Sequence, residues 1–190
     1  MSTTAPAAAV TEPASLSEEA KELLSHLRSH RKLYWDTKGW GAQAAMLCKK
    51  CDTAGIYISD VEIKTNEHLL PGAPAASAIA ANAAAIVEKA WGAVSAKYPK
   101  IAANAAVAKM LEVDLKNYLR TVSYGICADN TEFIRDEVVE KQLELYKMCG
   151  VEASVMKYGV DQLKAAAKEH IKSGFDGAAA CFDALAQRFA

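Results

Sequence analysis

Apolar residues recur every three or four positions along almost the whole chain, and this spacing constrains the fold more than any other feature. Such spacing places apolar side chains on one face of an α-helix. Strict alternation of apolar and polar residues, which indicates a strand, never lasts long enough to predict one. Alanine, the strongest helix former, supplies much of the 52% hydrophobic content. The sequence therefore predicts an all-α fold of about eight helices.

Capping residues and helix breakers divide the chain into these helices. The predicted helices cover residues 15–33, 40–52, 60–70, 74–97, 100–127, 133–149, 152–172 and 174–189. Gly55 is predicted to close the second helix, and Ser59 to begin the third. Residues 1–14 are rich in Ala, Thr and Pro and are predicted to be a disordered tail, with a remnant of a plastid transit peptide as an open alternative. Residues 15–40 are predicted to form an additional N-terminal helix and a tryptophan-containing linker, and residues 41–190 one helical domain.

The charge balance narrows the classes of partner. The 22 basic and 23 acidic residues leave a net charge of −1, which argues against nucleic acid and anionic membranes. No apolar run approaches the roughly 20 residues that cross a bilayer, so no membrane span is predicted. The five cysteines are an odd number in a chain too large to need disulfides, which favours reduced thiols in an intracellular compartment.

Candidate catalytic and metal-binding residues are few. His26 and His30 share a helical spacing that suits a metal, but no third ligand is evident nearby. Cys48 and Cys51 form a Cys-x-x-Cys motif, yet zinc needs a second ligand pair and the thioredoxin motif needs a βαβ context. Phosphate-binding loops and Gly-x-Ser-x-Gly are absent from the sequence. We therefore predict no metal site and no enzymatic activity.

One segment near the middle of the chain resembles a known family. Residues 118–125 read Tyr-Leu-Arg-Thr-Val-Ser-Tyr-Gly, similar to the Tyr-Leu-Arg-x-x-Thr-Tyr-Gly core of phycobiliprotein subunits. Further segments resemble other patterns of that family in the same order: 51–59, 79–87, 126–130, 146–150 and 181–183. The resemblance covers about residues 43–190. It implies a globin-like helical domain with two leading helices, to which this chain adds its own N-terminal helix.

The resemblance also shows where the chain departs from the family. Family members attach a linear tetrapyrrole, a bilin, through the Cys of a Cys-x-Arg-Asp motif. Leu111 replaces that thiol and Val113 replaces the arginine, whereas Asp114 matches the aspartate that binds the pyrrole nitrogens. The Pro-Gly-Gly-Asn loop that walls the family's pocket is missing. The resemblance therefore implies Asp114 as a pocket remnant and no bilin at the usual covalent position. A bilin held non-covalently, or through another thiol such as Cys127, stays open.

The positions that the family uses for subunit pairing are retained. In the family an Asp at the end of the first leading helix pairs with an Arg and a Tyr of a partner subunit, and Asp52, Arg120 and Tyr124 match these positions. This implies a subunit interface with a phycobiliprotein-like subunit or with photosystem or antenna proteins, in a hetero- or homo-oligomer. The additional helix, followed by Trp35 and Trp40, reads as a docking element.

Three functions follow from these expectations. The first is a non-enzymatic light-harvesting antenna subunit without the standard bilin, in the cyanobacterial cytoplasm or plastid stroma at the thylakoid face. The second is a pigment-bearing antenna subunit. The third is a globin-like sensor, for which His170 is the sole histidine late in a predicted core helix.

Overall fold

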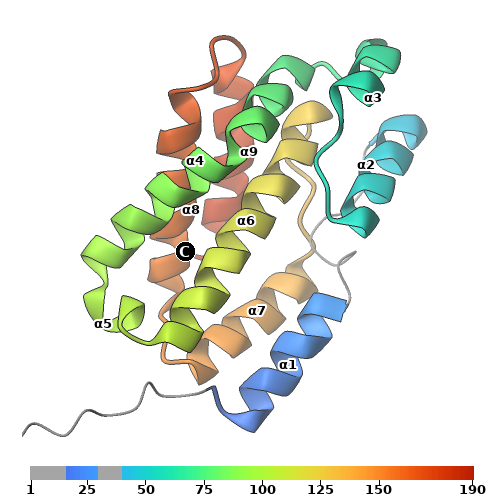
Figure 1. Ribbon diagram of the computed structural model, residues 1–190. Helices are drawn as coiled ribbons and strands as arrows, with labels where there is room; N and C mark the ends of the chain where they lie inside the picture. The colour runs from blue at the N-terminus through green and yellow to red at the C-terminus, as the bar shows by residue number, and fades with distance from the viewer. Residues whose placement is uncertain (1–15, 30–39) are drawn as a thin grey trace, which may run out of the picture.

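The computed structural model of the chain describes residues 16–29 and 40–190, and residues 1–15 and 30–39 lie outside the described part (Figure 1). The described residues form helices and no strand, which confirms the all-α prediction. The helices are α1 (Glu18–Ser29), α2 (Ala42–Ala54), α3 (Asp60–Thr65), η2 (Glu67–Leu69), α4 (Ala73–Lys97), α5 (Pro99–Ala102), α6 (Ala105–Cys127), α7 (Asp136–Met148), α8 (Ala153–Lys168) and α9 (Phe175–Gln187). The tail predicted for residues 1–14, with Trp35 and most of the linker, falls outside the described residues.

The centre of the molecule is a bundle in which α4 packs against both α6 and α8, and α8 packs against α9. Every residue of α6 from Tyr118 to Cys127 is buried, because neighbouring elements cover this half of the helix on all sides. Gly159 of α8 permits a close helix contact, since a Cβ atom there would lie 2.9 Å from Leu115 Cδ2. The described helices include none that is both long and apolar enough to cross a membrane.

The structure corrects several predicted helix boundaries. The helix predicted for 60–70 ends at Thr65, and the short 3-10 helix η2 follows after Asn66. The helix predicted for 100–127 is interrupted at Asn104, whose side chain accepts a hydrogen bond from the Val107 amide (3.3 Å) and begins α6. The helix predicted from residue 133 begins instead at Asp136, because Phe133 enters the core from a non-helical segment. The helix predicted to end at 172 ends at Lys168. At Asn104 a side-chain cap, and at Phe133 burial in the core, override the apolar spacing.

Two glycines fix the path of the chain around α2 and α4. Gly55 has φ 70° and ends α2, as the sequence predicted, in a conformation that side chains disfavour. Gly72 precedes α4 where the backbone touches the end of α6: a Cβ atom there would lie 1.7 Å from the Ile126 carbonyl oxygen. The Gly72 amide also donates to the Cys127 carbonyl (3.3 Å). The start of α4 therefore depends on a residue without a side chain.

The remaining helices lie on the outside of the bundle. Figure 1 shows α1 running alongside α7, and the two helices are in contact. Ala20 and Leu27 of α1 are buried, while most of the other described residues of this helix are exposed or partly exposed. Figure 1 also shows α2 and α3 to one side of the bundle, next to the C-terminal half of α6. The residues of both predicted sites lie on or beside α6.

Candidate functional site

The carboxylate of Asp114 is enclosed by side chains of the chain itself. Asp114 lies on α6 and is buried. From α7, Gln142 Nε2 and the Tyr146 hydroxyl both donate to Asp114 Oδ2, at 3.0 and 3.1 Å. The Tyr118 and Tyr146 hydroxyls lie 2.8 Å apart, which extends the network along α6. In this chain α7 thus supplies hydrogen-bond donors to the position that the resemblance assigned to a bilin.

Sequence reasoning missed Gln142 and Tyr146 as partners of Asp114. A signal was present, because Gln142 stands in the apolar stripe of α7 between Val138 and Leu145, where a polar residue needs a buried partner. The pattern alone does not say which residue that partner is.

The side chain at position 111 is buried and carries no reactive group. Leu111 is 0% exposed, so its side chain lies inside the core and faces no open pocket. Val113, at the position of the family's arginine, is partly exposed and carries no charge. The residues that the resemblance identified as replacements therefore leave neither a nucleophile nor a cation at this point of α6.

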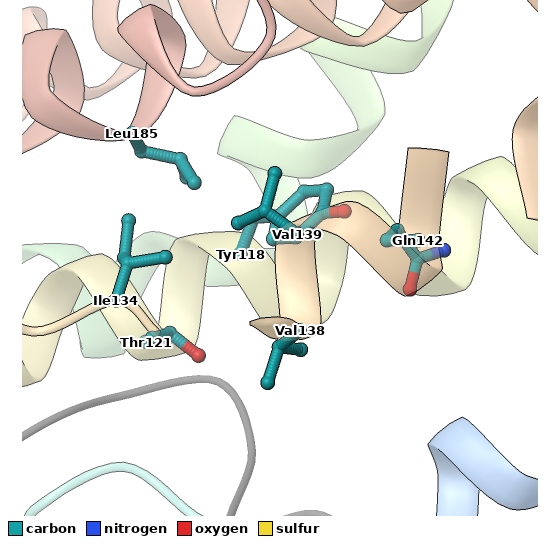
Figure 2. Close-up of a pocket in the computed structure, with 7 residues that line it drawn as sticks. All are labelled: Tyr118, Thr121, Ile134, Val138, Val139, Gln142 and Leu185. Carbon is teal, nitrogen blue, oxygen red and sulfur yellow. The ribbon is translucent and has the colours of Figure 1, made fainter. Parts of the chain in front are cut away.

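A cavity that borders this network is small. Its volume is about 10 Å³, on the order of one water molecule. Figure 2 shows its lining residues, which come from α6, α7, α9 and the segment before α7: Tyr118, Thr121, Ile134, Val138, Val139, Gln142 and Leu185. The lining is almost entirely apolar, and Thr121 Oγ1 is buried with no hydrogen-bond partner among the described residues. Between α6, α7 and α9 the side chains leave space for about one water molecule.

The second group of predicted site residues meets within one chain. Arg120 Nη2 lies 3.2 Å from Asp52 Oδ1, and the two side chains are 6% and 0% exposed. The Tyr124 hydroxyl donates to the Ile56 carbonyl oxygen (2.5 Å), and the Arg120 guanidinium lies 5.9 Å from the centre of the Tyr124 ring. Burial raises the pKa of Tyr124, so it remains a hydrogen-bond donor. The structure therefore joins Asp52, Arg120 and Tyr124 where α2 ends against α6; their contact with a partner subunit stays a prediction.

The segment between α2 and α3 is ordered by Glu62. Its carboxylate accepts hydrogen bonds from Lys50 Nζ (2.9 Å), the Ser59 amide (3.2 Å) and the Ser59 hydroxyl (2.9 Å). Ser59 in turn accepts from the Glu62 amide, which completes a capping box at the start of α3. The Cys51 thiol also donates to Glu62 (3.8 Å). These bonds tie the start of α3 to the end of α2.

We expect this segment to loosen in acid. The Lys50 hydrogen bond, followed by those from Ser59, lowers the pKa of Glu62 from 4.5 to about 2. Because the folded-state pKa lies below the unfolded one, the stabilisation is fully present above pH 4.5 and is lost as the pH falls towards 2. Amide hydrogen exchange of α3 should accelerate over this range, and Glu62→Gln should abolish the pH dependence. Glu112→Gln, which removes a surface pair on α6, is the control. Identical profiles for wild type and Glu62→Gln would contradict the assignment.

The cysteines and histidines show little reactive potential. Cys48, Cys51 and Cys127 are buried free thiols. Burial raises the pKa of Cys51 to about 11 and that of Cys127 to about 12, which disfavours the nucleophilic thiolate. Within the described ranges, no three ligand side chains gather to hold a metal, and His30 lies outside them. His170 lies beyond the end of α8 in a partly exposed turn, not inside the core as a globin ligand requires.

Three exposed apolar side chains lie on α2, on α3 and between them. Met46 and Val61 are about three-quarters exposed, and Ile56, between the two helices, is half-exposed. These three residues, named here the α2–α3 apolar residues, expose side chains that are usually buried, a property shared by protein-binding surfaces.

Comparison with known proteins agrees with this architecture. Residues 46–189 match the model of the phycobilisome protein family. The chain is 30% identical over 135 residues to allophycocyanin subunit beta-18 from Nostoc sp. (strain PCC 7120), an alignment that covers 66% of this chain and 80% of that protein. The matched region contains every helix from α4 to α9, and it contains Asp52, Asp114, Arg120 and Tyr124. The chain is therefore a divergent member of the phycobilisome protein family, with that family's globin-like all-α fold.

Proposed function

We propose that this chain is a non-enzymatic subunit of a photosynthetic light-harvesting assembly, acting through protein–protein contacts and carrying no bilin at the family's usual covalent position. The observation that carries the proposal is the closed state of that position. Leu111 is buried and has no nucleophile, and Asp114 is hydrogen-bonded by Gln142 and Tyr146 of the same chain. A pigment at this place would have to displace two hydrogen bonds that the chain already makes.

Because the Asp114 hydrogen bonds are buried, a bilin could displace them only at a cost in free energy. Breaking a buried hydrogen bond without replacing it costs about 1–3 kcal/mol. The adjacent cavity, about 10 Å³, offers no room that a large planar pigment would occupy without repacking α7. Because Gln142 and Tyr146 already donate hydrogen bonds to Asp114, we expect the folded chain to be stable without a pigment. A bilin held non-covalently, or through another thiol such as Cys127, is the second candidate; a non-covalent bilin would separate from the denatured chain, whereas a covalent one would stay attached.

We propose that the partner contacts the α2–α3 apolar residues, and that the predicted interface residues Asp52, Arg120 and Tyr124 contribute by holding the end of α2 against α6. Met46 and Val61 are exposed, whereas the ion pair that fixes the end of α2 is buried. The partner would be a phycobiliprotein-like subunit of the allophycocyanin type, or a photosystem-associated antenna protein, at the cytoplasmic or stromal face of thylakoids. The match to an allophycocyanin subunit supports this choice of partner.

Co-expression with bilin biosynthesis enzymes tests the pigment proposal. We expect wild-type protein to show no zinc-induced fluorescence on a denaturing gel, because no thiol occupies position 111. Leu111→Cys should remain dark too, since the new thiol would be buried and Val113 supplies no cation for a propionate. An allophycocyanin subunit expressed in the same cells is the positive control. A tetrapyrrole found by mass spectrometry on a wild-type peptide spanning residues 106–114 would refute the proposal.

A further inference from the structure

A hollow of about 300 Å³, open to solvent, lies between α4, α6 and the segment that joins α2 to α3. One of its walls is apolar and consists of Ala83, Ala84 and Val87 of α4. This volume is at the lower end of the range in which proteins hold small ligands, about 300–1,000 Å³. The hollow therefore has room for a small molecule and an apolar surface against which its body can pack.

The other side of the hollow carries hydrogen-bond donors. Lys116, Asn117 and Arg120 of α6 line it together with Tyr57, and none of the described residues around the hollow is acidic. Burial raises the pKa of Tyr57 to about 12, so its hydroxyl keeps its proton at neutral pH. Ammonium, amide, guanidinium and hydroxyl groups all donate hydrogen bonds, which an oxyanion accepts. This side of the hollow thus fits a carboxylate or a phosphate.

Arg120 is the donor that points most directly to a ligand. Its side chain is only 6% exposed, and a guanidinium carries several N–H donors. Among the described residues, Asp52 Oδ1 is the one acceptor of a guanidinium hydrogen bond (3.2 Å), and the Tyr124 ring lies 5.9 Å from the guanidinium carbon. The remaining N–H donors have no acceptor in the described part of the chain, and the hollow is the open space that this side chain borders.

We propose that this hollow is a binding site for a small organic anion, with a carboxylate or phosphate head on the donors of α6 and an apolar body against α4. Both cations already have an acidic partner, Asp52 for Arg120 and Glu112 for Lys116. The anion would therefore be recognised by directed hydrogen bonds at short range and not by a strong net positive field. The Glu112–Lys116 pair is exposed, so Lys116 can turn to a ligand at little cost. This site goes beyond the proposed role in assembly and does not depend on it.

Titration of the full-length protein with benzoate, phenyl phosphate and benzamide tests the proposal. The two anions carry the two possible heads on the same ring, and benzamide replaces the anionic head by a neutral one of similar shape. We expect at least one anion to bind with a dissociation constant of about a millimolar or lower, and benzamide to bind at least about tenfold more weakly. In nitrogen-15 NMR spectra the Gly55 backbone amide and the Asn117 side-chain amide, which line the hollow, should shift.

The same titration contains the results that would overturn the proposal. These are the absence of a shift at both amides with either anion at tens of millimolar, and binding of benzamide as tight as that of the anions. Inorganic phosphate has no ring to pack on α4 and should bind more weakly than phenyl phosphate. Equal affinities for these two would show an adventitious ion only, and would also overturn the site.

Two variants locate the ligand, and each has a matched control on the same helix. Lys116→Met should weaken anion binding about tenfold, whereas Lys109→Met, at an exposed position of α6 outside the hollow, should not change it. Ala84→Trp places a large ring in the hollow and should abolish binding, whereas Ala85→Trp, at the next exposed position of α4, should not. Arg120 is left intact, because its replacement would also remove the ion pair that holds α2.

Circular dichroism shows whether the tryptophan variants are folded. If Ala84→Trp does not fold, Lys116→Met and its control decide alone. Unchanged binding in Lys116→Met, or an equal loss in a variant and its control, overturns the proposal. The measurement involves no partner protein and no bilin, so it can fail while the proposed role in assembly holds, and the reverse.

Discussion

Replacing Arg120 by methionine is expected to weaken the docking of α2 on α6 by about 3–5 kcal/mol. The substitution keeps most of the side-chain volume but leaves the Asp52 carboxylate, which is 0% exposed, without its cation. The chain can limit this loss by releasing α2 so that Asp52 regains water. We therefore expect the α2 amides to exchange hydrogen as if locally unfolded, while α4 and α8 remain protected. Hydrogen exchange with mass spectrometry resolves these segments.

The matched control is Lys116→Met on the same helix, since Lys116 pairs with Glu112 at the surface. An exposed pair contributes only about 0–1 kcal/mol, so α2 exchange should not change. Asp52→Asn should resemble Arg120→Met, and the double variant should be less destabilised than the sum of the two, because both remove one contact. Strictly additive effects would show that the two side chains act independently.

Replacing Gly72 by alanine is expected to destabilise the whole domain by about 3 kcal/mol or more. The added Cβ atom would lie 1.7 Å from the Ile126 carbonyl oxygen and 2.7 Å from its carbonyl carbon. Backbone atoms of α6 cannot rotate away as a flexible side chain can, so the start of α4 must move off α6. The shift would also disturb the hydrogen bond from the Gly72 amide to Cys127. Urea denaturation followed by circular dichroism measures the loss.

Gly92→Ala, inside α4, provides the opposite expectation. Gly92 lies inside α4, and a Cβ atom there meets nothing within 4 Å. Alanine should therefore stabilise the helix by about 0.5–1 kcal/mol, through the lower backbone entropy of the unfolded chain. Equal effects at positions 72 and 92 would mean that the contact between Gly72 and α6 does not limit stability.

Local chemistry explains the parts of the fold that the sequence predicted well. The end of α2 at Gly55 and the start of α3 after Ser59 depend on residues within one turn of the boundary, and both predictions were correct. Asn104 is also a local signal, but the apolar spacing around it suggested an uninterrupted helix from residue 100. Phe133 is different, because its burial outside a helix results from distant neighbours. Helix boundaries that depend on capping residues can thus be predicted from the sequence, whereas boundaries that depend on tertiary packing cannot.

The sequence by itself determined the helical class, the family to which the chain belongs, and the identity of Asp52, Asp114, Arg120 and Tyr124 as residues of interest. The tertiary structure decided what these residues contact. It placed Gln142 and Tyr146 on Asp114, and it joined Asp52 to Arg120 across 68 positions of the same chain. A side chain's spacing fixes the helix face on which it lies, but not which distant element packs there. Which element packs there depends on how α2 and α7 pack against α6, and this packing is determined by the folded chain as a whole.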